Sequence, residues 1–494
     1  MLGERWVEKF GRISVGFQAG RGLVLSENVV PGQRVMYLSP SSLLHSGTIK
    51  HILPTRLLPK HSSFRSLNNG STSAMRNTSL IPMLLAIFRS TRRLMPHAMP
   101  TALNQLSPFL DTMPEEFGTV PLAWRRRVHL REQYSDIHRR LCQILPQRNA
   151  VQLEEVHEKY MGDYEQARTA FKRYRSELSE SMQSSLHDWT EEDFLWGWLC
   201  VNSRCVFLPL GLEPHADNFT LAPMLDMANH TTDPTREFKV KWTLKNGLEM
   251  HAPERSVARK VQGGAPEVGY EQERWHGLCS GDEVFITYGA HGNATLLSEY
   301  GFVLLDSAGK TGDNPFTDVV LDAQIKRHIE QLRTPSEVHA LLEEAGYWGS
   351  WTIQRAESEP AHPSWRTVTA LRLLAVYDAN FPNEARSTAL PQATSLVQDI
   401  ARWKKVVVGL LPHLTGSLEL RAATLLGQLA AEAQVDLQRC ILAADEMEAE
   451  GHQQGAISAS IGSIRALAQE ELQMLREVVA RCSGDNLRKE GPPW

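Results

Sequence analysis

The sequence predicts an α+β protein: a β-rich domain split by a helical insertion and followed by an all-α C-terminal domain. Short apolar segments bounded by turn residues fill residues 12–45 and return at 219–305. Between and after them, apolar residues recur at helical spacing, and such a change of period separates strands from helices. We therefore expect the β-rich domain at 1–315, with its insertion at about 75–190, and the helical domain at 316–494.

The predicted strands are short and bounded by turns. Residues 23–25 form an apolar strand, and Pro31-Gly32 marks the turn before a second strand at 35–38. Farther along the chain, 237–244 alternates in polarity, and DEVFITYG at 282–289 is rich in β-branched and aromatic residues. These segments predict the two parts of the β-rich domain.

The predicted helices are indicated by capping residues and by spacing. Thr190 with Asp193 three places later is typical of a capping box, and it precedes a helix at 193–204. From about 316 onward the sequence predicts only helices, and residues 457–479 keep a spacing of three and four. Two polar segments, at 46–78 and 253–281, lack such a period and are predicted to be loops.

Composition and charge argue against several classes of protein and of site. The 494 residues are 42% hydrophobic, and the net charge of -5 gives no support for direct nucleic-acid binding. Six cysteines without C-x-x-C spacing predict neither a metal site nor disulfides. The apolar stretch at 80–88 is too short to span a membrane, and the charged first ten residues do not resemble a signal peptide. We expect a monomer in the cytoplasm, the nucleus or both.

Two glycines and an arginine are the first candidates for a binding site. The Gly20-Arg21-Gly22 segment precedes a strand, and paired glycines allow a backbone to approach a ligand closely. From the residues alone, a plain tight turn is the more common explanation of such a pair. Arg204, at the end of its helix, could bind a ligand carboxylate or only complement the helix dipole.

A second group of candidates follows an apolar run. In the loop APMLDMANH at 222–230, Asp226, Asn229 and His230 could hydrogen-bond a polar ligand from several sides or simply shape a turn.

Aromatic residues near the predicted strand at 282–289 are the last candidates. Tyr288, Tyr300 and Phe302 could serve a site, although core packing is the usual role of such residues.

The order of these segments resembles the SET-domain methyltransferases of the Rubisco large-subunit methyltransferase type. The resemblance covers nearly the whole chain and is carried by six segments: 20–33, 106–124, 193–204, 222–230, 281–303 and 369–378. In that family a helical insertion splits the SET domain, and a helical substrate-binding domain follows. The resemblance therefore implies the same architecture, with S-adenosylmethionine (AdoMet) as cofactor and a lysine of a protein as substrate.

The resemblance also implies which residues form the site, because they match the family's motifs in position. The resemblance places the cofactor against Gly20, Arg21, Gly22, Arg204, Asp226, Asn229, His230, Tyr300 and Phe302, with Tyr288 as the active-site tyrosine. Family members modify ribosomal proteins, translation factors, Rubisco and histones, so the resemblance implies a protein partner of this kind. It requires no metal and no base at His230.

Two alternatives stay open. The same fold serves histidine methyltransferases, although Cys205, Val206 and Phe207 after the helix favour a lysine channel. A catalytically silent SET fold could also act as a binding module. The presence of Asn229, His230 and Tyr288 favours an enzyme, because site residues rather than fold decide function.

Overall fold

The computed structural model divides the chain into two compact units. The first unit comprises Met1–Phe117 and Glu155–Ala290, and the second comprises Gly118–Glu154 and His291–Trp494. The described residues are 13–16, 22–49, 52–53, 76–97, 99, 101–130, 135–175, 188–210, 218–243, 245–254, 277–305, 314–355, 359–381, 393–451 and 455–494.

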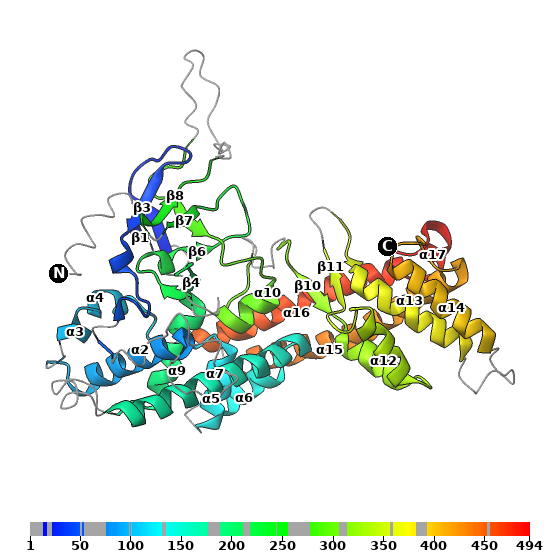
Figure 1. The fold of residues 1–494 in the computed structure, drawn as a ribbon, viewed down its shortest axis with the longest axis horizontal. Helices are drawn as coiled ribbons and strands as arrows, with labels where there is room; N and C mark the ends of the chain where they lie inside the picture. Colours follow the sequence, from blue (N-terminus) through cyan, green and yellow to red (C-terminus); the bar gives the residue numbers. More distant parts are fainter. Residues whose placement is uncertain are drawn as a thin grey trace, which may run out of the picture. The chain divides into compact units, whose positions relative to one another are not determined.

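The strands of the first unit form three small sheets (Figure 1). The first sheet has the order β1-β2-β9-β6, with β1 at Ile13–Gly16, β2 at Gly22–Leu25, β9 at Glu283–Ile286 and β6 at Asn229–His230. The second has the order β3-β8-β7, with β3 at Arg34–Leu38, β8 at Gly247–His251 and β7 at Lys239–Thr243. The third pairs β4 at Cys205–Phe207 with β5 at Phe219–Leu221.

In the first sheet, alternate side chains point to opposite faces, and one of these faces is buried. Leu23 of β2 lies opposite Val284 of β9, and both side chains are fully buried. Glu283, the residue before Val284, points to the other face because successive side chains in a strand alternate. Strand β6 is the exception in direction, since it pairs with β9 in parallel. The predicted strands at 23–25 and 35–38 are thus confirmed, and the strand predicted at 282–289 is confirmed for Glu283–Ile286.

Helices of the first unit pack closely. They are α2 at Asn77–Leu94, α3 at Thr101–Asn104, α4 at Ser107–Leu110 and α9 at Glu191–Arg204. The predicted capping box at Thr190 and Asp193 is present at the start of α9. A Cβ on Gly197 of α9 would lie 2.7 Å from the carbonyl oxygen of Pro82 in α2. Glycine is therefore needed where these two helices touch.

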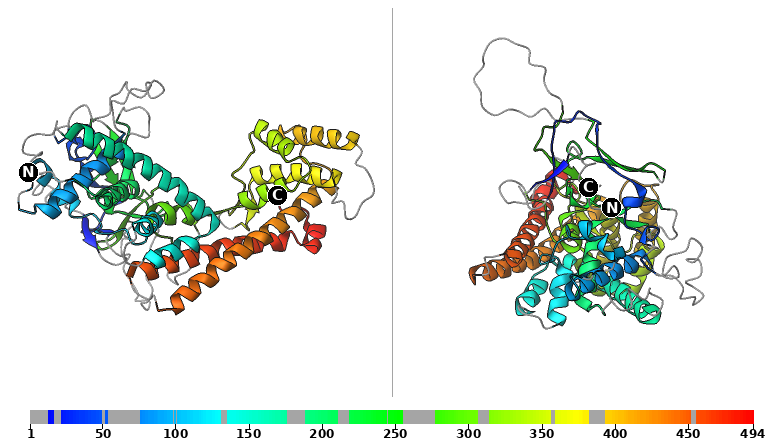
Figure 2. Two further views of the ribbon diagram at one scale, coloured as in Figure 1. Left: turned by 90° about the horizontal axis from the view of Figure 1, so that it is seen from below. Right: turned by 90° about the vertical axis from the view of Figure 1, so that its left-hand side faces the viewer.

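The second unit is mainly helical. Its helices are α5 at Pro121–His129, α6 at Ser135–Gln143, α10 at Asn293–Thr295, α11 at Asp322–Glu330, α12 at Pro335–Glu344, α13 at Trp365–Asn380, α14 at Ala393–Val407, α15 at Gly416–Ala449, α16 at Gly455–Arg481 and α17 at Gly484–Glu490. Helix α7 at Gln147–Tyr174 runs from this unit into the first. Figure 2 shows α15 and α16 lying side by side.

A small sheet interrupts the region from 316 that the sequence predicts to be only helical. Strands β10 at Asp318–Val320, β11 at Thr352–Gln354 and β12 at His362–Pro363 pair antiparallel. The prediction was wrong for these strands, because two- and three-residue segments are too short to show a period. Residues 118–154 and 291–315 also belong to this unit. A boundary between independently folding domains at 315–316 stays a prediction.

Several expectations about composition can be compared with the described residues. All six cysteines are free. None of the described helices is long and apolar enough to cross a membrane. The predicted loops at 46–78 and 253–281 lie mostly outside the described residues.

Candidate active site

Tyr288 lies two residues beyond the end of β9 and is fixed at two points. Its hydroxyl donates a hydrogen bond to the carbonyl oxygen of Ala228 at 2.9 Å. Its backbone N–H donates to Nδ1 of His230 at 3.1 Å, and the two rings stack with centroids 5.1 Å apart. The half-buried phenol is therefore held by the loop that the sequence analysis singled out, which comes from a distant part of the chain.

The same contact assigns a protonation state to His230. Because Nδ1 accepts a hydrogen bond from the backbone of Tyr288, the ring carries its proton on Nε2 and is neutral. The imidazole is buried, with 6% of the residue exposed. His230 thus serves as a support for Tyr288, and its Nδ1 is not available as a base.

Asn229 lies where three strands converge. It pairs with Phe285 in the parallel ladder between β6 and β9, and its Nδ2 donates to Oε1 of Glu283 at 2.6 Å. A Cβ on Gly22 of β2 would lie 2.8 Å from that Nδ2 and 2.9 Å from that Oε1. The close approach explains why Gly22 carries no side chain.

Glu283 is a site residue that the sequence reasoning missed. Its signal was a carboxylate within an apolar, β-branched strand, where charged residues are rare unless paired.

Arg204 pairs with Asp226 at the end of α9. Its guanidinium Nη1 donates to the backbone oxygen of Asp226 at 2.9 Å and to the carboxylate at 3.2 Å. The Asp226 side chain is fully buried, and that of Arg204 is 21% exposed. The Nε of Arg204 is buried and has no hydrogen-bond partner among the described residues. The arginine therefore does more than complement a helix dipole, because it pairs with the buried carboxylate of Asp226.

The loop between these residues holds an unusual backbone. Met224 has a φ of 68°, which a residue with a side chain adopts only at some cost. Three backbone bonds hold the turn that follows, from Asp226 N–H to Ala222, from Met227 N–H to Met224 and from Ala228 N–H to Leu225. Strained backbone of this kind clusters at functional sites. Here the turn places the Ala228 carbonyl against Tyr288.

Two predicted residues belong to the second unit. Tyr300 and Phe302 lie edge to face with centroids 6.3 Å apart, and between them Gly301 has a φ of 80°. A Cβ on Gly301 would lie 2.7 Å from Oγ1 of Thr119. Burial raises the pKa of the Tyr300 phenol. Their role in closing a cofactor pocket stays a prediction.

The structure thus brings together part of the predicted set. Within the first unit, Asn229 joins Gly22 through Glu283, and His230 joins Tyr288. Gly20 and Arg21 lie outside the described residues. No group of three or more His, Cys, Asp or Glu side chains in the described ranges is arranged to hold a metal ion.

Comparisons with known proteins found relatives that match part of the chain. No family model matches the chain. Ribosomal lysine N-methyltransferase set11 of Schizosaccharomyces pombe is 28% identical over 192 residues, which are 39% of this chain and 39% of that protein. SET domain-containing protein 4 of Mus musculus is 26% identical over 311 residues, which are 61% of this chain and 54% of that protein. The matches therefore span only about half, or less, of these curated relatives.

A solved structure matches over almost the full length. The SET domain of LSMT bound to lysine and AdoHcy has a TM-score of 0.56 at 12% identity, covering 99% of this chain and 95% of that one. At that identity the likeness shows the fold. The chain therefore has the fold of LSMT, and in sequence it is similar to ribosomal lysine N-methyltransferases.

Proposed function

We propose that this chain is an AdoMet-dependent protein-lysine N-methyltransferase. The observation that carries the proposal is the Tyr288 hydroxyl, held 2.9 Å from the Ala228 carbonyl beside the Asn229-His230 pair. Support comes from the relatives, among them a protein named for ribosomal lysine methylation, and from the LSMT structure with lysine and AdoHcy.

The residues present fit such a cofactor. AdoMet would supply a methyl group on a sulfonium, together with a carboxylate, an amino group and an adenine that need polar partners. The buried Nε of Arg204, which has no hydrogen-bond partner among the described residues, is a donor suited to a carboxylate. Asn229 uses one amide proton on Glu283, which leaves its second proton and its oxygen for a ligand. Because Gly22 has no Cβ, its backbone can lie close to the side chain of Asn229.

The chain's own groups would orient the amine. A carbonyl oxygen has two lone pairs, and the Ala228 carbonyl uses one of them on Tyr288. The second can accept an N–H of the substrate lysine and so direct the nitrogen lone pair. Alignment of nucleophile, methyl and leaving group is worth several kcal/mol, up to about 7–11 in favourable cases.

Desolvation would favour the reactive form of the lysine. A lysine has a solution pKa of about 10.4, so most of it is protonated at neutral pH. The half-buried ring of Tyr288 and the buried ring of His230 present apolar surface beside the carbonyl. Such surroundings disfavour the ammonium form, and neutral His230 adds no competing charge.

A protein substrate follows from the proposed activity, and ribosomal proteins are the first candidates because of the relative's name. We further propose a monomer that acts in the cytoplasm, the nucleus or both, without binding nucleic acid directly.

The test is methylation of purified ribosomal proteins with labelled AdoMet, followed by mass spectrometry of lysine-containing peptides. Calorimetry with AdoMet and AdoHcy should show binding to the wild-type chain. Absence of binding to both would refute the proposal.

A further inference from the structure

A buried carboxylate on the long C-terminal helix α16 reaches two other segments of the second unit. Glu470, 7% exposed, accepts from Nδ2 of Asn293 at 2.9 Å and from Oγ1 of Thr317 at 3.0 Å. The side chains of Asn293 and Thr317 belong to buried residues as well. Buried charged groups are retained where they are hydrogen-bonded, and here the contacts join parts of the chain more than 150 residues apart.

The side-chain oxygen of Asn293 makes a second hydrogen bond, on the side away from Glu470. Its Oδ1 accepts from the backbone N–H of Leu304 at 2.9 Å. The single amide therefore links α16 to the far end of the segment 293–304, which contains Tyr300 and Phe302. We call residues 293–304 the YGF segment.

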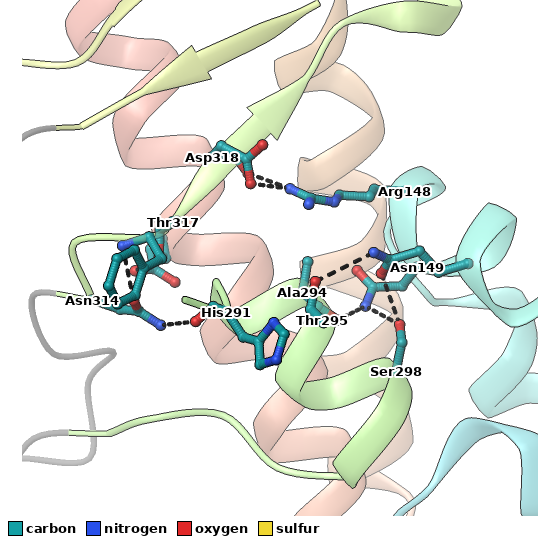
Figure 3. A network of polar contacts seen from close by, with 12 residues as sticks. Arg148, Asn149, His291, Ala294, Thr295, Ser298, Asn314, Thr317 and Asp318 are labelled. Atoms are coloured by element: carbon teal, nitrogen blue, oxygen red, sulfur yellow. Dashed lines mark hydrogen bonds and ion pairs between the residues drawn. The ribbon is translucent and has the colours of Figure 1, made fainter. Parts of the chain in front are cut away.

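The start of helix α7 holds the same segment through a separate set of contacts (Figure 3). Nδ2 of Asn149 donates to the carbonyl of Ala294 at 2.8 Å and to Oγ of Ser298 at 2.9 Å. Ser298 in turn donates to Oε1 of Gln152 at 3.0 Å. The YGF segment is thus held by polar side chains from two helices.

The backbone of the YGF segment explains why such support matters. Residues Leu296–Tyr300 form one turn of π-helix that ends at Gly301 in the left-handed region. A single π turn is a rare and functionally enriched geometry. The position of Tyr300 is therefore set by side chains outside the turn, in addition to the turn's own hydrogen bonds.

We propose that Glu470 is a positioning residue that sets the YGF segment for methyl transfer. The inference rests on the proposed function, and on the role predicted for Tyr300 and Phe302 from the family resemblance. It assigns to α16, in the region predicted for substrate binding, a second role in placing these aromatic residues.

The direction of the hydrogen bonds makes the proposal testable. A carboxylate only accepts, so Asn293 must turn its amino group to Glu470 and its oxygen to Leu304. Asn293→Asp would place two carboxylates face to face at the position of a 2.9 Å contact. In Asn293→Asp/Glu470→Gln, the introduced amide can donate to the introduced carboxylate while its carbonyl still accepts from Thr317. The double variant should therefore rescue the single one.

A neighbouring residue provides the matched control. Glu471 is adjacent on α16 and is also buried, at 3% exposed, but its Oε1 has no partner in the described part of the chain. Burial raises the pKa of its carboxyl to about 8. An amide should therefore replace it at neutral pH with little effect on the YGF segment.

The experiment measures hydrogen exchange in peptides covering the YGF segment of the full chain, together with methyl transfer to purified ribosomal proteins. We expect Asn293→Asp to raise exchange at Leu304 and to lower kcat at least tenfold. The double variant should restore both to within about threefold, and Glu471→Gln should change neither.

The outcomes separate the inference from the proposed function. Exchange needs neither cofactor nor substrate, so a wild-type chain without methyl transfer would count against the proposed function alone. If Asn293→Asp leaves exchange unchanged, or if the double variant fails to restore it, Glu470 does not position the segment. If exchange is disturbed while kcat and KM stay at wild-type values, the contact is only structural and the inference is wrong.

Discussion

Replacing Tyr288 by phenylalanine removes one hydroxyl and keeps the ring. The lost hydrogen bond to the Ala228 carbonyl, at 2.9 Å, is neutral and half-buried, so its loss should cost about 0.5–1.5 kcal/mol of unfolding free energy. For a domain of a few hundred residues this corresponds to a decrease in Tm of about 2–4 °C per kcal/mol. The stacking on His230 and the backbone bond to it should persist.

The expected effect on the rate is larger than the effect on stability. If the hydroxyl and the Ala228 carbonyl orient the amine together, losing this preorganised group should lower single-turnover methyl transfer about a hundredfold or more. A hundredfold is about 2.7 kcal/mol of activation free energy. Affinity for AdoMet should stay near the wild-type value, because the substitution keeps the ring of Tyr288 and its contacts with His230.

The assay is single-turnover transfer from labelled AdoMet to purified ribosomal proteins, with thermal melting of the same samples. Tyr160→Phe is the matched control, since its hydroxyl donates to Glu191 at 3.3 Å in the same unit and away from the site. The unfolding free energy of the control should fall by no more than that of Tyr288→Phe. Its rate of single-turnover methyl transfer should stay at the wild-type value. Near wild-type transfer by Tyr288→Phe would refute the assignment of the active site.

Three further outcomes are expected. Asn229→Ala should weaken AdoMet and AdoHcy at least tenfold in calorimetry, whereas equal affinity would remove this residue from the cofactor site. Gly22→Ala should also weaken binding of AdoMet and AdoHcy, because its Cβ would lie 2.8 Å from Nδ2 of Asn229. The control Gly162→Ala on α7, whose Cβ would have nothing within 4 Å, should bind both with wild-type affinity. Burial raises the pKa of Glu471 to about 8, so the folded chain retains a proton that the unfolded chain releases near pH 4.3. Stability should therefore fall by a few kcal/mol as pH rises from about 5 to 8, and Glu471→Gln should abolish that fall in denaturant titrations.

Local signals in the sequence predicted the elements that carry the site. The capping box at Thr190 marked the start of α9, and the β-branched and aromatic residues in 282–289 marked β9. Both depend on neighbours within a few residues, which a single sequence displays. The three short strands β10, β11 and β12 could not be predicted in this way, since their stability comes from pairing between residues up to 36 positions apart, as Asp318 and Gln354 are.

Parts of the site depend on groups that a sequence does not distinguish. The Ala228 carbonyl is a backbone atom present at every position, and only the turn after Met224 brings it to Tyr288. The pairing of Asn229 with Glu283 joins residues 54 positions apart. Such contacts follow from the register of β6 against β9, which depends on the tertiary fold.

The contact between Asn293 and Glu470 has a consequence for protein engineering. A chimera that exchanges residues 316–494 for those of another protein of this fold also exchanges Glu470 and Thr317, but keeps Asn293. An incoming helix without an acceptor at position 470 leaves Nδ2 of Asn293 buried without that partner, at a cost of about 1–3 kcal/mol. A transplanted C-terminal region must therefore begin before residue 293, or carry a carboxylate at 470 and a hydroxyl at 317.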